Sequence, residues 1–311
     1  MKTIVTVALN PAIDKSASVE NVVAERKLAC TAPRFEPGGG GVNVSRAIKK
    51  LEGESTVVYA AGGLTGQRLQ KLLSKEQLDH RPIAIKEAVR ENLVILEEST
   101  GQQYRFGMPG PELKKQEWEA FLEQLAEIEP SPDWMVLSGS LPAKVPADFF
   151  AMAAKIGKEK GAKIIVDTSG EPLDKVLQEG VYLIKPNIGE FKDLIGAKDP
   201  EEADIKKEAQ KMIRSGQCQV LVISLGSAGA LVISKEWTEH ITSPTVPIVS
   251  KVGAGDSMVA GIVYSLAQGK TLKEAALYGI AAGSAAVMTP GSELCRKEDT
   301  ERLFNSMKAK R

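Results

Sequence analysis

The sequence has few cysteines and no excess of charge of either sign. Its 311 residues include 40 Lys and Arg and 40 Asp and Glu, so the chain has no overall electrostatic field to hold a nucleic acid or an anionic membrane. The cysteines, Cys30, Cys218 and Cys295, are far apart and in no metal-ligand spacing. We therefore expect neither a disulfide framework nor a zinc site, but three buried thiols in a reducing compartment.

Long hydrophobic runs are also absent. The run Ile4–Leu9 is too short for a signal peptide and is followed by Asn10 and Pro11, while the apolar stretch after residue 256 is interrupted by Gly261 and Ser265. We expect a cytoplasmic protein without a membrane span. With 43% hydrophobic and 26% charged residues, the composition is that of an ordinary globular protein.

Short apolar runs rich in β-branched residues alternate with amphipathic segments. Such runs are typical of strands buried on both faces, and spacings of three and four residues place the apolar side chains of the intervening segments on one helix face. This alternation predicts an α/β fold, a mostly parallel sheet sandwiched by helices. The predicted strands are Ile4–Leu9, Thr56–Ala61, Trp134–Leu137, Lys163–Val166, Val181–Ile184, Val220–Ile223, Ala230–Ser234 and Trp237–Thr242, followed by three helices from about Ala254.

Two stretches break this rhythm. Ser16–Phe35 has no helical period, and Asn92–Phe106 has two strand-like runs around a turn. Together they predict a small β-element, from about 16–35 and 88–108, outside the main sheet. Because no linker, repeat or low-complexity tract divides the chain, we expect residues 1–311 to form a single domain.

Glycine-rich turns between a strand and a helix are common ligand sites in α/β sheets. Gly38–Gly41 leads directly into a helix and allows close approach of a ligand to the backbone, although such a run alone is more often a flexible loop. The run Gly253–Gly255 precedes an apolar helix whose first amides suit an anion. Asp256 follows, as a functional carboxylate or as an ordinary N-cap.

Other candidate residues have functional and structural interpretations of similar weight. The pattern Asn187-x-x-Glu190 after Lys185 suits a hydrated Mg²⁺, although one such pattern is expected by chance. Ser224-Leu225-Gly226-x-x-Gly229 is either a ligand turn or a simple hairpin. The remaining candidates are Asp14, a ligand or a turn residue, and Lys27 and Arg90, charged side chains of a kind that usually face water.

In their order and spacing these motifs resemble those of the PfkB-type carbohydrate kinases. The resemblance rests on Pro37-Gly38-Gly39-Gly40-Gly41-Val42-Asn43-Val44-Ser45-Arg46-Ala47 and Val252-Gly253-Ala254-Gly255-Asp256-Ser257-Met258, and it runs from Thr3 to the C-terminal helices. Within the family, Lys27–Pro33, Phe35–Gly41, Gln103–Phe106 and Ala281–Ala286 most resemble the ATP-dependent 6-phosphofructokinases. The resemblance implies a ribokinase-like fold with a β-sheet lid, a homodimer formed through that lid, and transfer of the γ-phosphoryl group of Mg-ATP to fructose 6-phosphate.

The resemblance also implies a role for each motif residue. The implied sugar-phosphate ligands are Asp14, Lys27, Gly38, Gly39, Asn43, Arg90 and Ser138, with Lys27 and Arg90 at the phosphate. The implied nucleotide ligands are Lys185, Asn187, Ser224, Gly226, Gly229 and Ser284. Glu190 would order Mg²⁺ through water, the amides of Gly253, Ala254 and Gly255 would hold the γ-phosphoryl, and Asp256 would be the base. A potassium ion is implied near Ser250, Val252, Ala286 and Gly291, but Thr289, Pro290 and Glu293 in that loop leave potassium dependence open.

The sequence is also compatible with a kinase for another sugar phosphate, a non-catalytic sensor or a nucleoside kinase. Fructose-1-phosphate and tagatose-6-phosphate kinases commonly have a lysine in the place of Gly40, so the all-glycine run favours fructose 6-phosphate over those two substrates. A non-catalytic sugar or nucleotide sensor would be expected to lack Asp256 or Glu190, and both are present. A nucleoside kinase fits less well, because aromatic residues make up only 5% of the chain.

Overall fold

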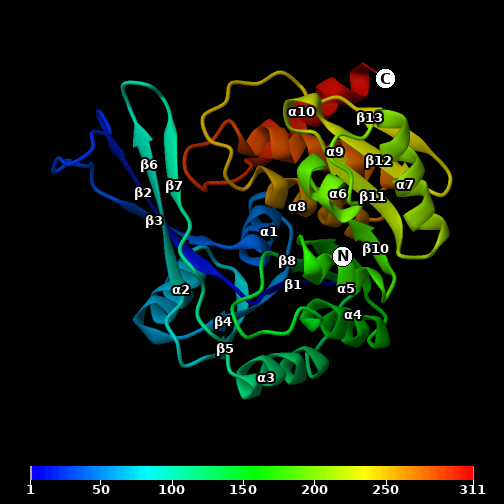
Figure 1. The fold of residues 1–311 in the computed structure, drawn as a ribbon, viewed down its shortest axis with the longest axis horizontal. Helices are drawn as coiled ribbons and strands as arrows, with labels where there is room; N and C mark the ends of the chain where they lie inside the picture. The colour runs from blue at the N-terminus through cyan, green and yellow to red at the C-terminus, as the bar shows by residue number, and fades with distance from the viewer. Residues whose placement is uncertain (1, 311) are drawn as a thin grey trace.

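A large sheet runs through the molecule, with helices on both of its faces (Figure 1). The computed structural model describes residues 2–310, and within that range this sheet has nine strands, in the order β13-β12-β11-β10-β9-β8-β1-β4-β5. They are β1 (Ile4–Ala8), β4 (Thr56–Ala61), β5 (Asp79–Ala84), β8 (Trp134–Ser138), β9 (Lys163–Asp167), β10 (Val181–Ile184), β11 (Cys218–Ser224), β12 (Ala230–Ser234) and β13 (Thr238–Ile241). From β11 to β5 neighbouring strands are parallel, whereas β12 is antiparallel to both of its neighbours.

Successive side chains of the central strands face opposite helical layers. In β8, Val136 packs in the core formed with α1, α8 and α9, whereas Met135 and Leu137 pack in the core formed with α3, α4 and α5. The helices are α1 (Gly40–Lys50), α2 (Gly63–Lys75), α3 (Lys115–Ala126), α4 (Phe149–Glu159), α5 (Glu171–Leu177), α6 (Ile188–Leu194), α7 (Glu202–Arg214), α8 (Ala254–Ala267), α9 (Leu272–Ala286) and α10 (Lys297–Ala309). Both faces of the sheet are therefore buried, as its β-branched strands require.

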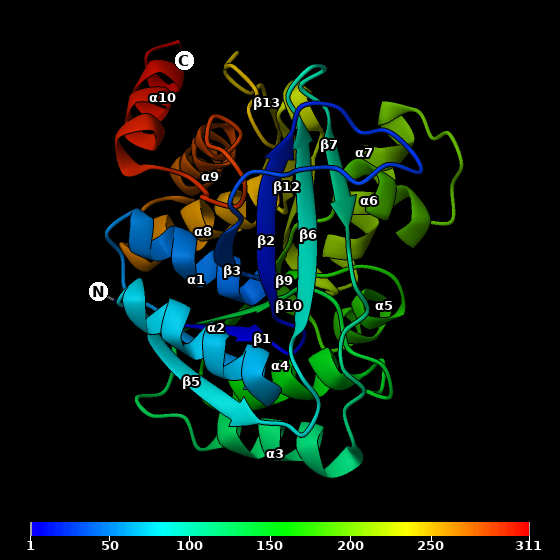
Figure 2. The same cartoon turned by 90° about the vertical axis from the view of Figure 1, so that its left-hand side faces the viewer.

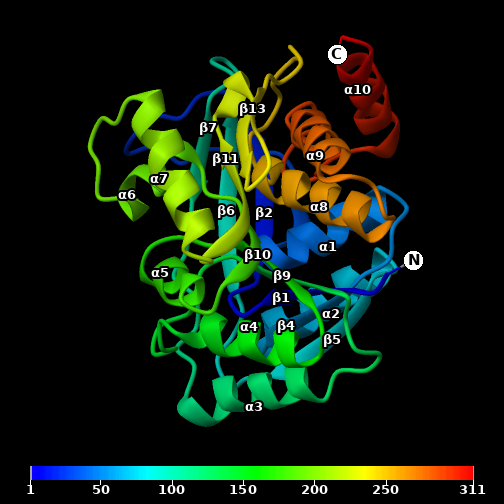
Figure 3. The same ribbon diagram turned by 90° about the vertical axis from the view of Figure 1, so that its right-hand side faces the viewer.

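The C-terminal helices cover one face of the large sheet. Helix α8 packs along α1 and α9, and α10 lies on the outer side of α9 (Figure 3). Small residues bring α8 and α9 close together, since a Cβ on Gly261 would lie 2.9 Å from the Cα of Gly279. The first turn of α8 also packs closely on α9, since a Cβ on Gly283 would lie 3.1 Å from the carbonyl oxygen of Ala254.

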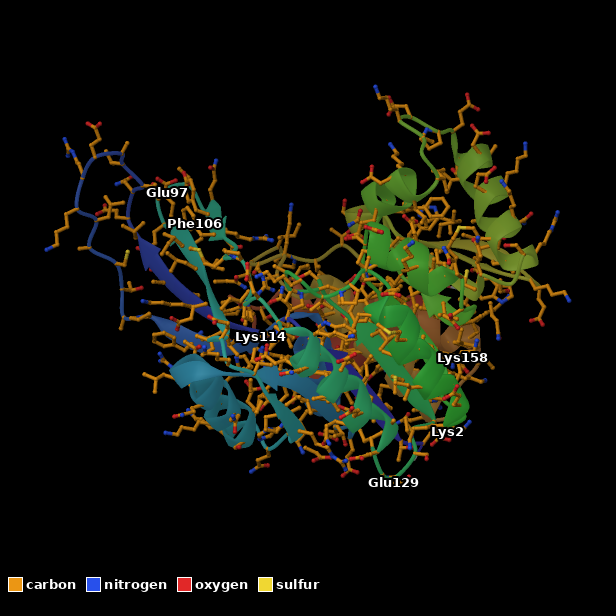
Figure 4. All side chains as sticks on the ribbon, turned by 60° about the horizontal axis from the view of Figure 1, so that its bottom comes forward. Lys2, Glu97, Phe106, Lys114, Glu129 and Lys158 are labelled. Carbon is orange, nitrogen blue, oxygen red and sulfur yellow. The ribbon has the colours of Figure 1, made fainter. Side chains whose placement is uncertain are left out.

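A second sheet projects from the side of this body (Figures 1 and 2). Among residues 2–310 it consists of four strands in the order β3-β2-β6-β7, with bounds β2 (Ala12–Val19), β3 (Arg34–Gly38), β6 (Arg90–Glu97) and β7 (Gln103–Phe106). Glu97 and Phe106 lie on this small sheet, away from the helical layers (Figure 4). It is reached directly from β1 and leads directly into α1, so it borders the ends of the central strands.

The predicted fold class is confirmed, and each of the eight predicted strands is present within two residues of its predicted bounds. Strand β5 was not predicted, because its sequence, DHRPIA, is polar and contains a proline that only an edge strand tolerates. The expectation of three buried cysteines is wrong for Cys30, which is exposed in the segment between β2 and β3, and right for Cys218 and Cys295. Within residues 2–310 no helix combines the length and hydrophobicity needed to cross a bilayer.

Candidate active site

A cavity of about 480 Å³ opens where the central strands end and the helices begin. Ser138 and Asp167, the last residues of β8 and β9, line it together with Gly40, Glu190 and Asp256 from the first turns of α1, α6 and α8. Residues from five elements far apart in the sequence therefore meet at the carboxyl edge of the sheet, where α/β proteins bind their ligands.

Asp256 lies in the first turn of α8 and is bonded to α1. The N-cap of α8 is Gly253, in the left-handed region with φ 72°, so the interpretation of Asp256 as an ordinary N-cap is wrong. Instead its Oδ2 accepts a hydrogen bond of 2.9 Å from Nδ2 of Asn43. This bond joins the two glycine-rich motifs of the sequence, and its acceptor, Asp256, lines the cavity.

The charges around Asp256 shift its protonation. Burial, and then the nearby Asp167 carboxylate, raise the pKa of Asp256 to about 6, against the opposing effects of the Asn43 amide and Lys185. Lys185, which is 5% exposed, forms an ion pair of 3.1 Å with Asp167. Burial disfavours its charge, but Asp167, Asp256 and Glu190 together outweigh burial and raise the pKa of Lys185.

The first turn of α8 is suited to an anion. Its leading amides carry no internal partners, as at every helix N-terminus, and a Cβ on Gly255 would lie 3.3 Å from Nζ of Lys185. The missing side chain therefore lets the ammonium group lie beside the positive end of the helix. A phosphate fits this combination of amides and a buried cation.

Asn187 and Glu190 cap α6 reciprocally. Glu190 Oε2 accepts a bond of 2.8 Å from the Asn187 amide, and Asn187 Oδ1 accepts one of 2.9 Å from the Glu190 amide. The N-x-x-E pattern thus has a local structural role, while Glu190 also lines the cavity. Within residues 2–310 no three His, Cys, Asp or Glu side chains are grouped to hold a metal ion.

The Ser224–Gly229 turn lies beside the start of α6. It joins β11 to β12 through a bond of 2.8 Å from Leu225 N to Gly229 O, with Gly226 and Gly229 both at positive φ. Ser224 N donates to Pro186 O at 3.0 Å, next to Asn187. The hairpin interpretation of this motif is thus correct, and the hairpin contacts the residue before Asn187.

The glycines before α1 allow contacts that a side chain would prevent. A Cβ on Gly38 would lie 2.4 Å from Oδ2 of Asp14, and one on Gly40 would lie 2.4 Å from Oγ of Ser138. Gly39 has φ 95°, in the region where glycine is favoured. The segment therefore fits tightly between β2 and the end of β8.

Several buried polar atoms at this edge have no partner. Among the described side chains they include Oδ1 of Asn43, Oγ of Ser138 and Nε of Arg90. Asp14, which is 8% exposed, accepts one bond of 2.9 Å from Asn92. Buried polar groups normally have partners, so these atoms are available to hydrogen-bond a ligand, and Ser138 lines the cavity.

Arg90 and Lys27 differ in their surroundings. The Arg90 guanidinium donates at 3.2 Å to the carbonyls of both Met108 and Asn10. Burial lowers its pKa, and Asp14 partly opposes that shift. Lys27 lies exposed in the segment between β2 and β3, so the structure does not bring it together with the other candidates.

The candidate potassium residues meet in one pair of loops. Ser250 Oγ donates to Gly291 O at 2.9 Å and accepts from Val252 N at 3.2 Å. The Ala286 carbonyl accepts a bond of 2.8 Å from the hydroxyl of Thr289. Ser284, the remaining nucleotide candidate, donates its hydroxyl at 2.8 Å to Ile280 O within α9. The hydroxyl can still accept a hydrogen bond from a nucleotide, but it can donate one only if this bond breaks.

Sequence reasoning missed Asp167 and Asn92. Asp167 forms the ion pair with Lys185 and lines the cavity. It directly follows the predicted strand Lys163–Val166, so its place at the end of a buried strand was the available signal. Asn92 contacts Asp14 only because β2 and β6 pair, and no short motif indicates that pairing.

The chain is similar over its whole length to known sugar kinases. Residues 1–299 match the family described as pfkB family carbohydrate kinase. The chain is 40% identical over 305 residues to ATP-dependent 6-phosphofructokinase isozyme 2 of Escherichia coli (strain K12), with 98% of each chain covered. It is 32% identical to a 1-phosphofructokinase of Borreliella burgdorferi (97% of this chain, 96% of that one) and 31% identical to a tagatose-6-phosphate kinase of Staphylococcus epidermidis (89% and 91%).

Crystal structures of phosphofructokinase-2 from Escherichia coli have the same fold. The complex with potassium has a TM-score of 0.95 at 39% identity, and the complex with fructose-6-phosphate has a TM-score of 0.93 at 39% identity. A tetrameric inhibited form also has a TM-score of 0.93. Each of these structures covers 99% of this chain and 100% of its own.

The raised pKa of Asp256 predicts how Asp256→Asn changes stability with pH. The unfolded carboxyl ionises near 3.8 and the folded one near 6, so ionisation disfavours the folded state as pH rises through this interval. The variant lacks this effect. We expect its free energy of unfolding, minus that of the wild type, to rise by about 1 kcal/mol between pH 5 and pH 8, measured by urea denaturation.

Glu123→Gln, on the exposed face of α3, is the control for a carboxylate outside the cavity. Its difference from the wild type should stay constant over the same pH range. A constant difference for Asp256→Asn as well would contradict the raised pKa.

Proposed function

The chain belongs to the pfkB family of carbohydrate kinases, and we propose that it transfers the γ-phosphoryl group of ATP to fructose 6-phosphate, giving fructose 1,6-bisphosphate and ADP. The observation that carries this proposal is the bond between Asn43 and Asp256. It holds a carboxylate that lines the cavity beside an amide and the N-terminus of α8. A sugar hydroxyl and a phosphate need these groups side by side for transfer.

The choice of fructose 6-phosphate is supported by identity and by Gly40. The 6-phosphofructokinase relative is 40% identical, whereas the 1-phosphofructokinase and tagatose-6-phosphate kinase relatives are 32% and 31% identical. A Cβ at Gly40 would lie 2.4 Å from Ser138 Oγ and 2.6 Å from Gly139 N. The lysine common at this place in the other two groups would therefore force the end of β8 to move.

Asp256 is proposed as the general base. Its Oδ2 is held by Asn43, so the carboxylate is oriented toward the cavity without being neutralised. It accepts the proton of the attacking hydroxyl as the new P–O bond forms and the bond from the γ-phosphorus to the bridging oxygen of ADP breaks. With a pKa of about 6 the carboxylate is mostly ionised at neutral pH, as a base must be.

The first turn of α8 and Lys185 are proposed to hold the transferring phosphoryl. The amides of Gly253, Ala254 and Gly255 present donors at the positive end of the helix, and Lys185 adds a cation whose orientation Asp167 fixes. Phosphoryl transfer has a loose transition state, so this positioning and charge stabilisation supply most of the rate.

Mg²⁺ and the nucleotide are proposed to bind between α6 and the β11–β12 turn. Glu190 and Asp167 supply the carboxylate oxygens that Mg²⁺ prefers, directly or through water, and Asn187, Ser224, Gly226, Gly229 and Ser284 border the nucleotide. When bound, Mg²⁺ neutralises charge on the phosphate oxygens. Potassium is proposed for the loops of Ser250, Val252, Ala286 and Gly291, on the strength of the gathered hydroxyl and carbonyl oxygens.

The sugar phosphate is proposed to bind against the small sheet. Its hydroxyls would meet Asp14, Asn43, Ser138 and the backbone of Gly38 and Gly39. Its phosphate would meet the fork of Arg90, whose Nε is buried and unpaired. Lys27 completes this subsite only if its exposed segment moves toward it.

The small sheet is proposed as a lid and as the surface of a homodimer. A lid excludes water, which would otherwise accept the phosphoryl group. Leu93, Val94 and Ile95 of β6 are only partly buried in one chain, and Phe106 and Val23 are exposed, so the sheet has apolar surface for a second subunit. Since the related Escherichia coli enzyme has a tetrameric inhibited form, a larger assembly of such dimers is part of the proposal.

The proposed substrate is tested by measuring ADP release from Mg-ATP in a coupled assay with fructose 6-phosphate, fructose 1-phosphate, tagatose 6-phosphate and fructose. We expect the highest kcat/KM with fructose 6-phosphate. A higher value with fructose 1-phosphate or tagatose 6-phosphate would replace the proposed substrate, and no ADP release with any sugar would support a sensor without activity.

Asp256→Asn tests the general base. We expect kcat to fall about a hundredfold or more, because no carboxylate then accepts the proton. The side-chain oxygen of the introduced asparagine can still accept the hydrogen bond from Asn43, so the local structure should be kept. The measurement is kcat at saturating sugar phosphate and Mg-ATP, together with a thermal melt. A variant that melts normally and keeps more than about a tenth of the wild-type kcat would exclude this role.

Arg90→Ala tests the phosphate subsite. We expect binding of the sugar phosphate to weaken by about 1.5 to 3 kcal/mol through the loss of charged hydrogen bonds, with ATP binding nearly unchanged. Calorimetry with each ligand measures both. Arg105→Ala, on the neighbouring strand β7, is the matched control for loss of positive charge on the small sheet, and equal losses in the two variants would refute a specific role for Arg90.

A further inference from the structure

Ser292, in the loop after α9, is bound from two sides. It is 3% exposed, and both its amide (3.3 Å) and its hydroxyl (3.2 Å) donate to Oε2 of Glu36 on β3. Its carbonyl accepts a bond of 3.0 Å from Nη1 of Arg46 on α1. The loop is therefore attached both to the small sheet and to the helix that begins with the glycine-rich turn.

The buried side chain of Arg46 contacts both the loop of Ser292 and strand β3. It is 2% exposed, its Nη1 also donates to Pro37 O at 2.8 Å, and its Nη2 lies 3.7 Å from Glu36 Oε1. The other carboxylate partner is Glu76 of α2, which accepts from Nε at 2.8 Å and from Nη2 at 2.7 Å. Glu36 therefore contacts both Ser292 and the buried Arg46, and these contacts hold the loop of Ser292 against β3 and α1.

Glu36 is next to the proposed sugar site. Strand β3 lies between β2 and α1 (Figure 2), and in the register of β2 and β3 Glu36 is directly opposite Asp14. Residues directly opposite each other in a sheet share a face. A substrate held by Asp14 therefore restricts the same strand pair that carries Glu36.

From Ser292 the contacts continue to the first turn of α8. Gly291 O accepts from Ser250 Oγ at 2.9 Å, and Ser250 Oγ accepts from Val252 N at 3.2 Å. The next residue, Gly253, is the N-cap of α8. Three hydrogen-bonded steps, from Glu36 to Ser292, from Gly291 to Ser250 and from Ser250 to Val252, thus join the small sheet to the turn proposed to hold the γ-phosphoryl.

We propose that Glu36 is a positioning residue that couples sugar-phosphate binding at the small sheet to nucleotide binding at the α8 N-terminus, through Ser292. This inference rests on the proposed function of the same site. A sugar phosphate that orders β2 and β3 also orders Glu36, and with it the loops of Ser292 and Ser250. The nucleotide then binds to an already ordered turn, so each ligand increases the affinity of the other.

The test is the affinity of a non-hydrolysable Mg-ATP analogue, measured by calorimetry with and without saturating fructose 6-phosphate at constant potassium. In the wild type we expect the sugar phosphate to tighten analogue binding by about fivefold or more. Glu36→Gln removes the charge that Ser292 and Arg46 face, and Ser292→Ala removes the hydroxyl donor. In both variants the tightening should fall to less than half of the wild-type factor, while the affinity for each ligand alone changes less than about twofold.

Two further variants separate this role from general stability. Ser292→Thr keeps the hydroxyl and should restore the wild-type factor. Glu76→Gln is the matched control, because it neutralises the other carboxylate partner of Arg46 without touching Ser292, and it should leave the factor unchanged. Thermal melts show whether each variant is folded at the assay temperature.

The outcomes are distinct. Full tightening in Ser292→Ala and Glu36→Gln, or an equal loss in Glu76→Gln, would overturn the proposal. So would a wild type that binds both ligands with no tightening. A wild type that neither binds nor phosphorylates any sugar phosphate would overturn the proposed function itself, and with it this inference.

Discussion

The hydrogen bond between Asn43 and Asp256 is the contact on which the arrangement of the site depends. It spans 213 positions of sequence and joins the first turns of α1 and α8. The bond is possible because both helices begin at the carboxyl edge of the sheet and pack along each other. Around it, the end of β8, the end of β9 and the start of α6 close the cavity.

Charge balance gives this cavity its chemical character. Lys185 is a buried cation among Asp167, Asp256 and Glu190, and these carboxylates raise its pKa. Asp167, which is bonded to Lys185, in turn raises the pKa of Asp256, whereas Lys185 lowers it. The site thus carries more negative than positive charge by itself. A bound divalent cation would compensate this charge, which agrees with a reaction that uses a metal complex of a nucleotide.

The central sheet was predictable because its strands are short, apolar and β-branched, and this pattern depends on local sequence alone. The polar edge strand β5 lacks the pattern and was missed. In the site, the two glycine runs and Asp256 belong to short motifs between a strand and a helix. Their place at the edge of the sheet could therefore be predicted from the sequence. Asp167, Asn92 and the Glu36–Ser292 contact depend on strand order and on pairing between distant segments, which no short motif encodes.

The segment between β3 and α1 has a mechanical consequence. Strand β3 ends at Gly38 and α1 begins at Gly40, so only Gly39, at φ 95°, separates the small sheet from a helix of the body. A rotation of the small sheet is therefore transmitted to α1 unless Gly39 absorbs it. Its exchange for the small sheet of another enzyme would have to include the turn up to Gly41, where a Cβ would lie 2.2 Å from the carbonyl oxygen of Val7.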